Sequence, residues 1–319
     1  QNNVTREVFA RESSAGREQD QSFTPLYRFH VEAMMRAYAL EGSKEAASRK
    51  LSILLLYQAA GRSSEVKYIA LDSMHWDPQF SCVVAELPQM KVSKWKIVTF
   101  VAGENRHCCW FAAFGDDLVM HTVLYESQYA GTKLGQYMKQ LMPNTTIQKY
   151  KDYAVTTLPD DTSAGGIRPG VCNALAAAIP TEFVVQINGH SLLGASALYE
   201  YVDAQVALHM PGMCVLAGFP PPPWGQVGYG PKPASIQALI DAGVASRAEL
   251  ETMIRELFNY DGNTPLSFQP GGKLFGAIAA ALATLIMYYG ERCKAREMLA
   301  VRNRMKDAWL TVFRPGAMS

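Results

Sequence analysis

The sequence has little that would tie it to a metal or to an oxidising compartment. Its six cysteines form no Cys-x-x-Cys pair, and no histidine stands at zinc-finger spacing from any of them. This pattern is typical of scattered core cysteines in a reduced compartment, and it argues against a disulfide framework. His107-Cys108-Cys109 comes nearest to a metal motif, but metal-binding cysteines are normally spaced apart, so we expect no metal.

A clear membrane span is also lacking. The longest apolar run, residues 274–289, is short for a span and rich in alanine, which predicts a buried helix that packs closely on its neighbours. No secretory signal peptide opens the chain. The first residue is Gln1 rather than Met, so we expect a processed or truncated chain. We expect no membrane partner and a reduced intracellular compartment, the nucleus in a eukaryote.

Excess charge of either sign is absent. The net charge of the 319 residues is +1, with 18% charged and 49% hydrophobic residues. This balance indicates a globular chain and excludes global disorder. A protein of this composition that binds nucleic acid has to gather its Lys and Arg locally.

The pattern along the chain predicts a mostly helical fold with a small antiparallel sheet, an α+β class. The predicted helices cover residues 27–40, 44–60, 110–125, 132–141, 171–178 and 195–208, and the predicted strands of one hairpin cover residues 82–87 and 95–101. No internal repeat is evident. Residues 234–258 and 273–310 predict two further helical stretches. Ser235 and Ser246 are the predicted helix starts in the first of them, and Glu249 completes a capping box with Ser246.

Changes in composition predict four segments. These are a flexible lead-in over residues 1–22, a mixed domain over residues 23–210, a proline-rich strap over residues 211–233 and a helical C-terminal module over residues 234–319. The strap contains four consecutive prolines at 220–223, which exclude a helix or a central strand there.

One group of residues has a spacing that suggests a catalytic site. Gly189-His190 is followed, nine residues after the histidine, by Tyr199, and Arg168 precedes both. A tyrosine that attacks a phosphodiester needs cationic and hydrogen-bonding groups around the same phosphate, because its phenol has an ordinary pKa near 10. An isolated tyrosine among the fifteen here would be a packing residue, and the spacing from His190 distinguishes Tyr199. Tyr201 is the competing candidate.

Two more cations stand upstream. Arg62 follows the apolar second helix and can fork two hydrogen bonds onto phosphate oxygens, although a surface arginine paired with Glu65 is the simpler interpretation. Lys91 lies in the polar turn of the predicted hairpin. Lys94 and Lys96 are alternatives to it, and a solvated hairpin lysine is the other interpretation.

Over residues 25–205 the chain resembles a tyrosine recombinase of the phage-integrase-like family. The residues that carry the resemblance, in the family's order, are Arg62, Lys91, Arg168, His190 and Tyr199. The looser motifs resemble divergent mobile-element members, such as those of Cryptons or tyrosine-recombinase retrotransposons. The family normally carries histidine, sometimes lysine, three residues before the second arginine, and this chain has Gly165 there.

The resemblance implies a recombinase catalytic domain and site-specific DNA strand cleavage and rejoining. Tyr199 would form a 3′-phosphotyrosine link and release a 5′-hydroxyl, with Lys91 as general acid and with no metal, nucleotide or other cofactor. The implied partner is double-stranded DNA, bound by a homo-oligomer on paired sites, with no small-molecule substrate. Arg62, Arg168, His190 and Tyr199 would converge on one pocket.

Two other interpretations remain open at this point. A catalytically impaired or domesticated DNA-binding protein would keep the fold and lose the chemistry, which Gly165 and the near-neutral charge favour. An unrelated helical binding protein would match the motifs by chance.

Overall fold

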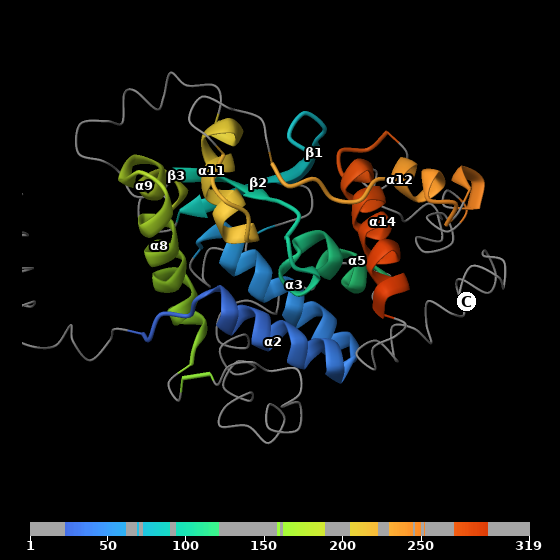
Figure 1. Cartoon of the computed structure of the whole chain (residues 1–319). Helices are drawn as coiled ribbons and strands as arrows, with labels where there is room; N and C mark the ends of the chain where they lie inside the picture. Colours follow the sequence, from blue (N-terminus) through green and yellow to red (C-terminus); the bar gives the residue numbers. More distant parts are fainter. Residues whose placement is uncertain are drawn as a thin grey trace, which may run out of the picture.

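The structure of the chain is a computed structural model. It describes residues 23–61, 69, 73–89, 94–120, 158–159, 162–188, 205–222, 230–244, 246–249, 252 and 271–292. These residues form a mostly helical fold with one three-stranded antiparallel sheet, which confirms the predicted fold class (Figure 1).

The first two helices form a hairpin of helices with a two-residue connection. Helix α2 covers Arg28–Glu41 and helix α3 covers Lys44–Ala59, close to the predicted 27–40 and 44–60. Gly42 ends α2 in the left-handed region, at φ 63°, where the lack of a Cβ removes the steric penalty. Ser43 starts α3, because its hydroxyl accepts a hydrogen bond of 3.0 Å from the backbone N–H of Ala46.

The sheet has the order β1-β2-β3, with both pairs antiparallel. Strands β2 (Cys82–Gln89) and β3 (Lys94–Phe100) are the predicted hairpin, which is therefore confirmed. Strand β1 (Met74–Asp77) was not predicted, although its four residues alternate between apolar and polar, because four is the shortest run on which such a pattern can rest. The backbone N–H of Trp76 in this strand also donates to the carbonyl of Lys273, at 2.8 Å.

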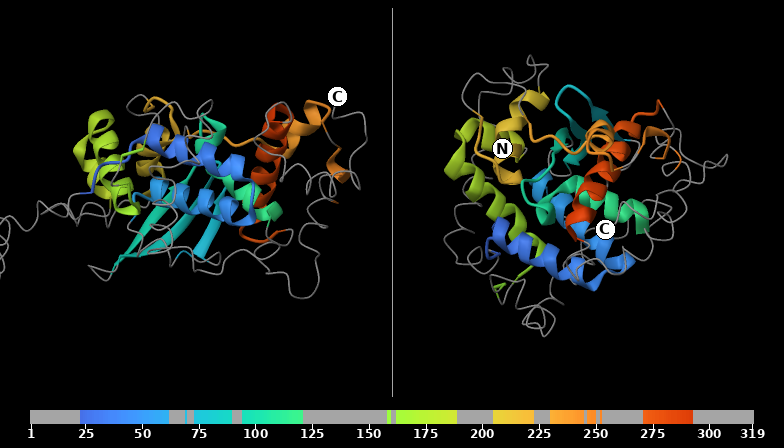
Figure 2. Two further views of the ribbon diagram at one scale, coloured as in Figure 1. Left: turned by 90° about the horizontal axis from the view of Figure 1, so that it is seen from below. Right: turned by 45° about the vertical axis from the view of Figure 1, so that its right-hand side comes forward.

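The core lies where α3 and helix α5 (Trp110–Met120) meet the sheet. Figure 2 (left) shows the strands crossing beneath α3, with α2 on the far side of that helix. Trp110 is 1% exposed and stacks between Phe100 and Phe114, with ring centroids 5.2 Å and 4.7 Å away. Burial of these large rings supplies much of the hydrophobic stabilisation at this point.

One ion pair is buried inside this core. The ammonium group of Lys50 on α3 pairs with the carboxylate of Asp116 on α5, and the two side chains are 5% and 1% exposed. The neighbouring Ser48 hydroxyl donates to the Asp117 carboxylate at 2.7 Å. The two helices are thus joined by polar contacts as well as by apolar packing.

At one end of the molecule lie α8 (Ile167–Ala178), α9 (Thr181–Ile187) and α11 (Gln205–Ala217) (Figure 1). Helix α8 begins four residues before the predicted 171. Helix α11 ends beyond the predicted 208 and passes through Pro211, so the strap predicted from residue 211 overlaps this helix. A proline inside a helix costs about 3 kcal/mol, and close packing of α11 on α8 and α9 offsets that cost.

The described C-terminal part contains α12 (Ile236–Asp241) and α14 (Phe275–Arg292). The stretch predicted as helical over residues 234–258 is interrupted between its two predicted helix starts, because Gly243, at φ 68°, follows the end of α12. Both predicted helix starts are confirmed. The hydroxyl of Ser235 accepts from the N–H of Ala238 at 3.0 Å, and Ser246 and Glu249 form the reciprocal pair of a capping box.

Helix α14 lies at the other end of the molecule from α8 (Figures 1 and 2). The predicted burial of the run 274–289 is confirmed over most of its length, since Leu274, Ile278 and Leu285 are fully buried against the same core. Within the described ranges, no helix has the length and apolarity that crossing a membrane requires. The division into four segments stays a prediction.

Candidate functional site

Of the five residues predicted to form the site, Arg168 is the one that the structure describes. Arg62, Lys91, His190 and Tyr199 lie outside the described residues, as does the competing Tyr201. Lys94 and Lys96 lie in strand β3, where their side chains are not described. The geometry of the site is therefore built from Arg168 and from the described segments next to the other four.

Arg168 lies in the first turn of α8, not before the helix as the sequence predicted. Its guanidinium Nη2 donates a hydrogen bond of 2.6 Å to the backbone carbonyl of Asn188. Asn188 is the residue immediately before Gly189-His190. The second arginine motif and the start of the Gly-His motif are thus joined directly.

Asn188 is itself held firmly at the end of α9. It is 3% exposed, and both its backbone N–H and its side-chain Nδ2 donate to the carbonyl of Val184, at 3.0 Å and 2.9 Å. Its side-chain Oδ1 is buried and has no hydrogen-bond partner among the described residues.

Helix α11 lies downstream of the candidate tyrosine and packs on the same two helices. Its described part starts at residue 205, six positions after Tyr199, and contacts both α8 and α9, whereas residues 195–204 of the predicted helix lie outside the described residues. The contact is close at Gly212, where a Cβ would meet the side chain of Ile187. Gly212 therefore packs on Ile187, the residue immediately before the Asn188 to which Arg168 is bonded.

The helix that leads into Arg62 is anchored to the end of the sheet. Gln58, near the C-terminal end of α3 and 1% exposed, donates to the Val101 carbonyl at 3.2 Å and accepts from the Val101 N–H at 2.9 Å. Helix α3 contacts α8 and α11 as well. The described residues on either side of three predicted motifs thus belong to one packed unit.

The position that departs from the family pattern has a structural cause. Gly165 lies in the short 3-10 helix η5 (Ala164–Gly166), directly before α8. A Cβ built on Gly165 would be 2.5 Å from the ring of Phe23. The ring of Phe23 therefore occupies the space into which a side chain at 165 would project.

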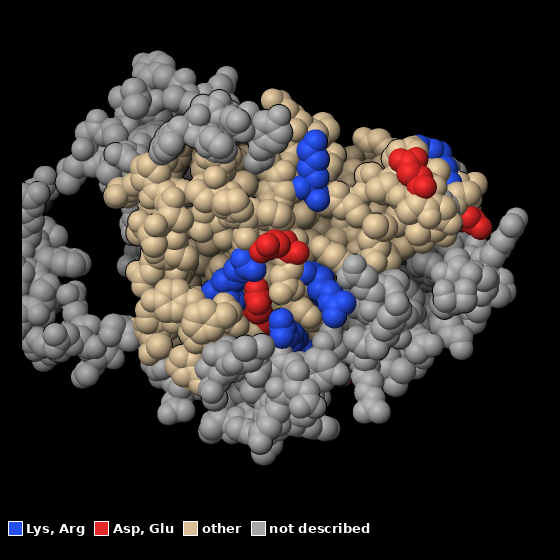
Figure 3. Space-filling view, viewed as in Figure 1, with Lys and Arg blue, Asp and Glu red and all other residues tan. Residues whose placement is uncertain are grey.

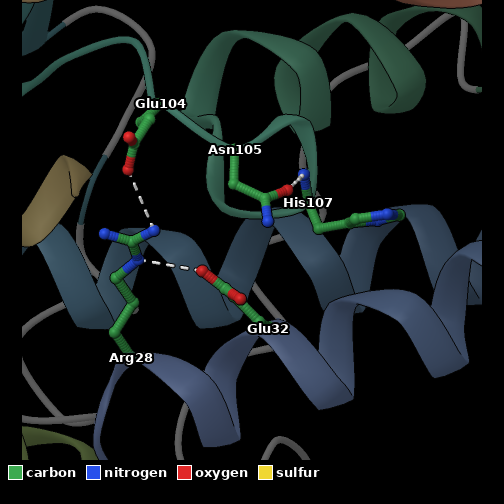
Figure 4. Close-up of polar contacts among 5 residues, drawn as sticks. All are labelled: Arg28, Glu32, Glu104, Asn105 and His107. Carbon is green, nitrogen blue, oxygen red and sulfur yellow. Dashed lines mark hydrogen bonds and ion pairs between the residues drawn. The ribbon is translucent and has the colours of Figure 1, made fainter. Parts of the chain in front are cut away.

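A second polar group, away from Arg168, joins α2 to the loop after the sheet. The Arg28 guanidinium donates to Glu32 at 2.8 Å and to Glu104 at 3.2 Å, and the side chain of Asn105 accepts from the backbone N–H of His107 at 2.9 Å (Figure 4). The N–H of Glu104 also donates to the carbonyl of Ala217, the last residue of α11, at 2.9 Å. The sequence analysis did not single out this group.

The charged side chains of this group are paired with one another. Figure 3 shows Lys and Arg next to Asp and Glu in a small cluster near the centre of that face, with mostly uncharged residues above it. Arg28 is paired with two carboxylates in the same chain, which is the arrangement of a structural ion-pair network. We therefore assign this cluster to the fold rather than to substrate binding.

Three of the described cysteines are unsuited to nucleophilic or metal chemistry. Burial raises the pKa of the Cys214 thiol to about 11, and burial also raises the pKa values of Cys82 and Cys108. A thiol that stays protonated is a poor nucleophile and a poor metal ligand. In the part of the chain that the structure describes, no group of three His, Cys, Asp or Glu side chains could hold a metal ion.

The sequence itself has no close match: no protein-family model matches it, and no curated protein is similar to it. The structure is similar to the XerH site-specific recombinase bound to palindromic difH substrate in a post-cleavage complex, with 15% identity, 58% of this chain and 51% of that chain covered, and a TM-score of 0.36. The matched part spans about half of the XerH chain. A second similar structure is a Flpe mutant in complex with a DNA Holliday junction, with 11% identity, coverage of 91% and 73%, and a TM-score of 0.49.

Proposed function

We propose that this protein cleaves and rejoins DNA strands at specific sites through a phosphotyrosine intermediate, as a divergent tyrosine recombinase of mobile-element type. The observation that carries the proposal is the bond of Arg168 to the Asn188 carbonyl. Arginine is a common phosphate ligand, and this bond holds Arg168 next to the residue that precedes Gly189-His190. Such proximity is needed if Arg168 and His190 are to bind the same phosphate.

The proposed roles follow from the chemistry of each group. Tyr199 attacks the phosphorus as its hydroxyl proton passes to water, so that its oxygen forms the new P–O bond and the 5′ oxygen leaves. Arg62 and Arg168 stabilise the charge that develops on the phosphorane oxygens, since guanidinium groups fork onto phosphate. His190 donates a hydrogen bond to the phosphate, and Lys91 gives its proton to the leaving oxygen.

The reaction conserves the energy of the broken bond. The phosphotyrosine is attacked by the 5′-hydroxyl of a partner strand, which restores a phosphodiester and frees Tyr199. No nucleotide or metal has to be consumed in either step. Exchange between two duplexes needs two or more protomers, so the proposal includes a homo-oligomer on paired DNA sites.

A second candidate function is DNA binding without cleavage. The observation that favours it is the ring of Phe23 at the place of a side chain on Gly165, where the family normally presents a histidine or lysine. Loss of that group would slow phosphoryl transfer while leaving the arginines to bind the phosphate backbone.

A covalent trapping experiment separates the two functions. The purified chain is incubated with a pool of nicked duplexes that have a randomised central sequence, such that cleavage releases a short 5′-hydroxyl fragment. The fragment diffuses away, rejoining is blocked, and a protein–DNA adduct accumulates that survives denaturation. Sequencing the trapped DNA identifies the preferred site.

The variant Tyr199→Phe is expected to give no adduct and to bind DNA with unchanged affinity, since only the nucleophilic oxygen is removed. Tyr201→Phe is the matched control and should retain the adduct. An adduct that persists in Tyr199→Phe and disappears in Tyr201→Phe would assign the reaction to Tyr201. DNA binding without an adduct in the unmodified protein would establish the binding function instead.

A further inference from the structure

The segment Phe23–Leu26 lies across the N-terminal end of α8. The backbone N–H of Leu26 donates to the carbonyl of Gly166 at 2.8 Å, and Leu26 is fully buried. Further along, the Tyr27 hydroxyl accepts from the side chain of Asn173 on α8 at 3.4 Å. Figure 1 shows this segment running beside the start of α8 before it enters α2. We call residues 23–26 the N-terminal segment.

Two glycines, one in η5 and one in α8, allow the backbone of this segment to approach closely. A Cβ on Gly166 would collide with the carbonyl oxygen of Thr24, and a Cβ on Gly170 would collide with the carbonyl oxygen of Leu26. In each case the nearest atom belongs to the backbone, which cannot move without displacing the segment. Glycine is therefore required at 166 and 170 for this packing.

At a third glycine, Gly165, the neighbouring atoms belong to a side chain. The three atoms nearest to a Cβ on Gly165 all belong to the Phe23 ring, at 2.5 Å to 2.7 Å. Phe23 is 53% exposed, so the ring covers Gly165 from the solvent side. Because η5 runs directly into α8, residues 165 and 168 are three positions apart on a helical path and lie on similar faces. The ring thus covers the surface next to the base of Arg168.

We propose that the N-terminal segment is part of the candidate phosphate site: Phe23 fills the place of the side chain that position 165 lacks, and the segment holds the first turn of α8, and with it Arg168, in position. Phe23 is then a positioning residue, and Gly165 is a matched partner of Phe23 rather than a lost catalytic group. The catalytic part of this inference rests on the proposed function.

A side chain at position 165 and the Phe23 ring cannot occupy the same space. A histidine at 165 should therefore displace the N-terminal segment while Phe23 is present. Removing the ring should relieve that displacement. The effects of Gly165→His and of Phe23→Ala should therefore be coupled. The effects of two substitutions whose side chains do not meet are normally additive.

The experiment is a double-mutant cycle between Gly165→His and Phe23→Ala in the full chain. Hydrogen exchange of the Leu26 amide reports whether its bond to the Gly166 carbonyl persists. We expect faster exchange in Gly165→His, nearly unchanged exchange in Phe23→Ala, and exchange in the double variant close to that of Phe23→Ala alone. Phe29→Ala is the matched control, because Phe29 is 51% exposed on the same stretch and is not among the atoms nearest to Gly165.

The functional readout is the rate of adduct formation at saturating nicked DNA. Phe23→Ala should lower this rate by about tenfold to a hundredfold, as small displacements of catalytic groups do, with the affinity for DNA nearly unchanged. The conservative variant Phe23→Leu should restore most of the rate. A purely structural role of Phe23 would lower the unfolding temperature and leave the rate of the folded protein unchanged.

The outcomes separate the two proposals. Additive effects of Gly165→His and Phe23→Ala on exchange of the Leu26 amide would overturn the coupling. So would a Phe29→Ala substitution that slows exchange in Gly165→His as much as Phe23→Ala does. Coupled exchange together with an unchanged rate in Phe23→Ala would overturn the positioning role. Absence of an adduct in the unmodified protein would overturn the proposed function, and the exchange cycle would still decide whether Phe23 and Gly165 are partners.

Discussion

The Nη2 atom of Arg168 lies 2.6 Å from the backbone oxygen of Asn188, so one side chain bridges twenty positions of sequence. A guanidinium can hold a carbonyl through one nitrogen while its remaining N–H groups face another direction. This bond fixes the exit of α9, from which the chain enters Gly189-His190. It makes Arg168 a structural residue as well as a candidate phosphate ligand.

Arg168→Lys should therefore weaken the fold even in the absence of DNA. A lysine lacks the planar fork, so the Asn188 carbonyl loses a charged donor in a buried setting, at a cost of about 1–3 kcal/mol in the free energy of unfolding. Urea denaturation measures this cost. Arg247→Lys is the control, since Arg247 is exposed and its replacement should change stability by less than about 0.5 kcal/mol. Equal stability of both variants would contradict the structural role of Arg168.

Removal of one partner of the buried ion pair should be costly. Lys50→Met leaves the Asp116 carboxylate uncompensated between α3 and α5, which typically costs about 3–5 kcal/mol in unfolding free energy. The double variant Lys50→Met with Asp116→Leu should recover most of that loss, because no charge then stays buried. Lys44→Met tests the loss of an exposed lysine on the same helix and should be nearly neutral. Urea denaturation of the unmodified protein and the three variants completes the comparison, and a double variant no more stable than Lys50→Met would refute it.

The contact between α5 and α14 should depend on Gly115. A Cβ there would be 2.8 Å from the carbonyl oxygen of Ala281 and 3.1 Å from the Cβ of Leu285, so the two helices would have to separate. Gly115→Ala is expected to lower the unfolding free energy by about 1–3 kcal/mol, despite the better helix propensity of alanine. In Gly165→Ala, by contrast, only the exposed ring of Phe23 has to move, so the loss should be smaller. Calorimetry of both variants tests the order.

Protonation of His30 should destabilise the start of α2. Its Nδ1 accepts a hydrogen bond of 3.1 Å from the N–H of Tyr27, which requires the neutral ring. Burial lowers the pKa of His30 below its ordinary value of 6.5, so the unfolded chain binds the proton more readily than the folded protein. Stability from this residue is therefore fully present above pH 6.5 and is lost as the pH falls towards the folded pKa.

The measurement is the free energy of unfolding against pH for the unmodified protein and for His30→Gln. As the pH falls below 6.5, the unfolding free energy of the unmodified protein should fall relative to that of His30→Gln. This relative loss should level off below the folded pKa of His30. Parallel curves across that range would show that His30 does not carry this pH dependence.

Several elements could be predicted because their signals are local. Helix α3 has a serine cap and a continuous apolar run, and strands β2 and β3 have β-rich runs around a polar turn. The capping box of Ser246 and Glu249 needs only four consecutive residues. The motif residues, their order and the departure at Gly165 are also properties of the sequence alone, and so is the resemblance on which the proposed function was first based.

Other features depend on contacts between distant segments. Strand β1 has only four residues and is held by β2 and by the carbonyl of Lys273. Helix α11 continues through Pro211 because α8 and α9 pack against it. The sequence showed that Gly165 lacks a side chain, whereas only the tertiary structure brings Phe23 over it from 142 positions away. Local propensity and spacing act along the chain, but the volume that a side chain can occupy is decided by whichever segment packs against it.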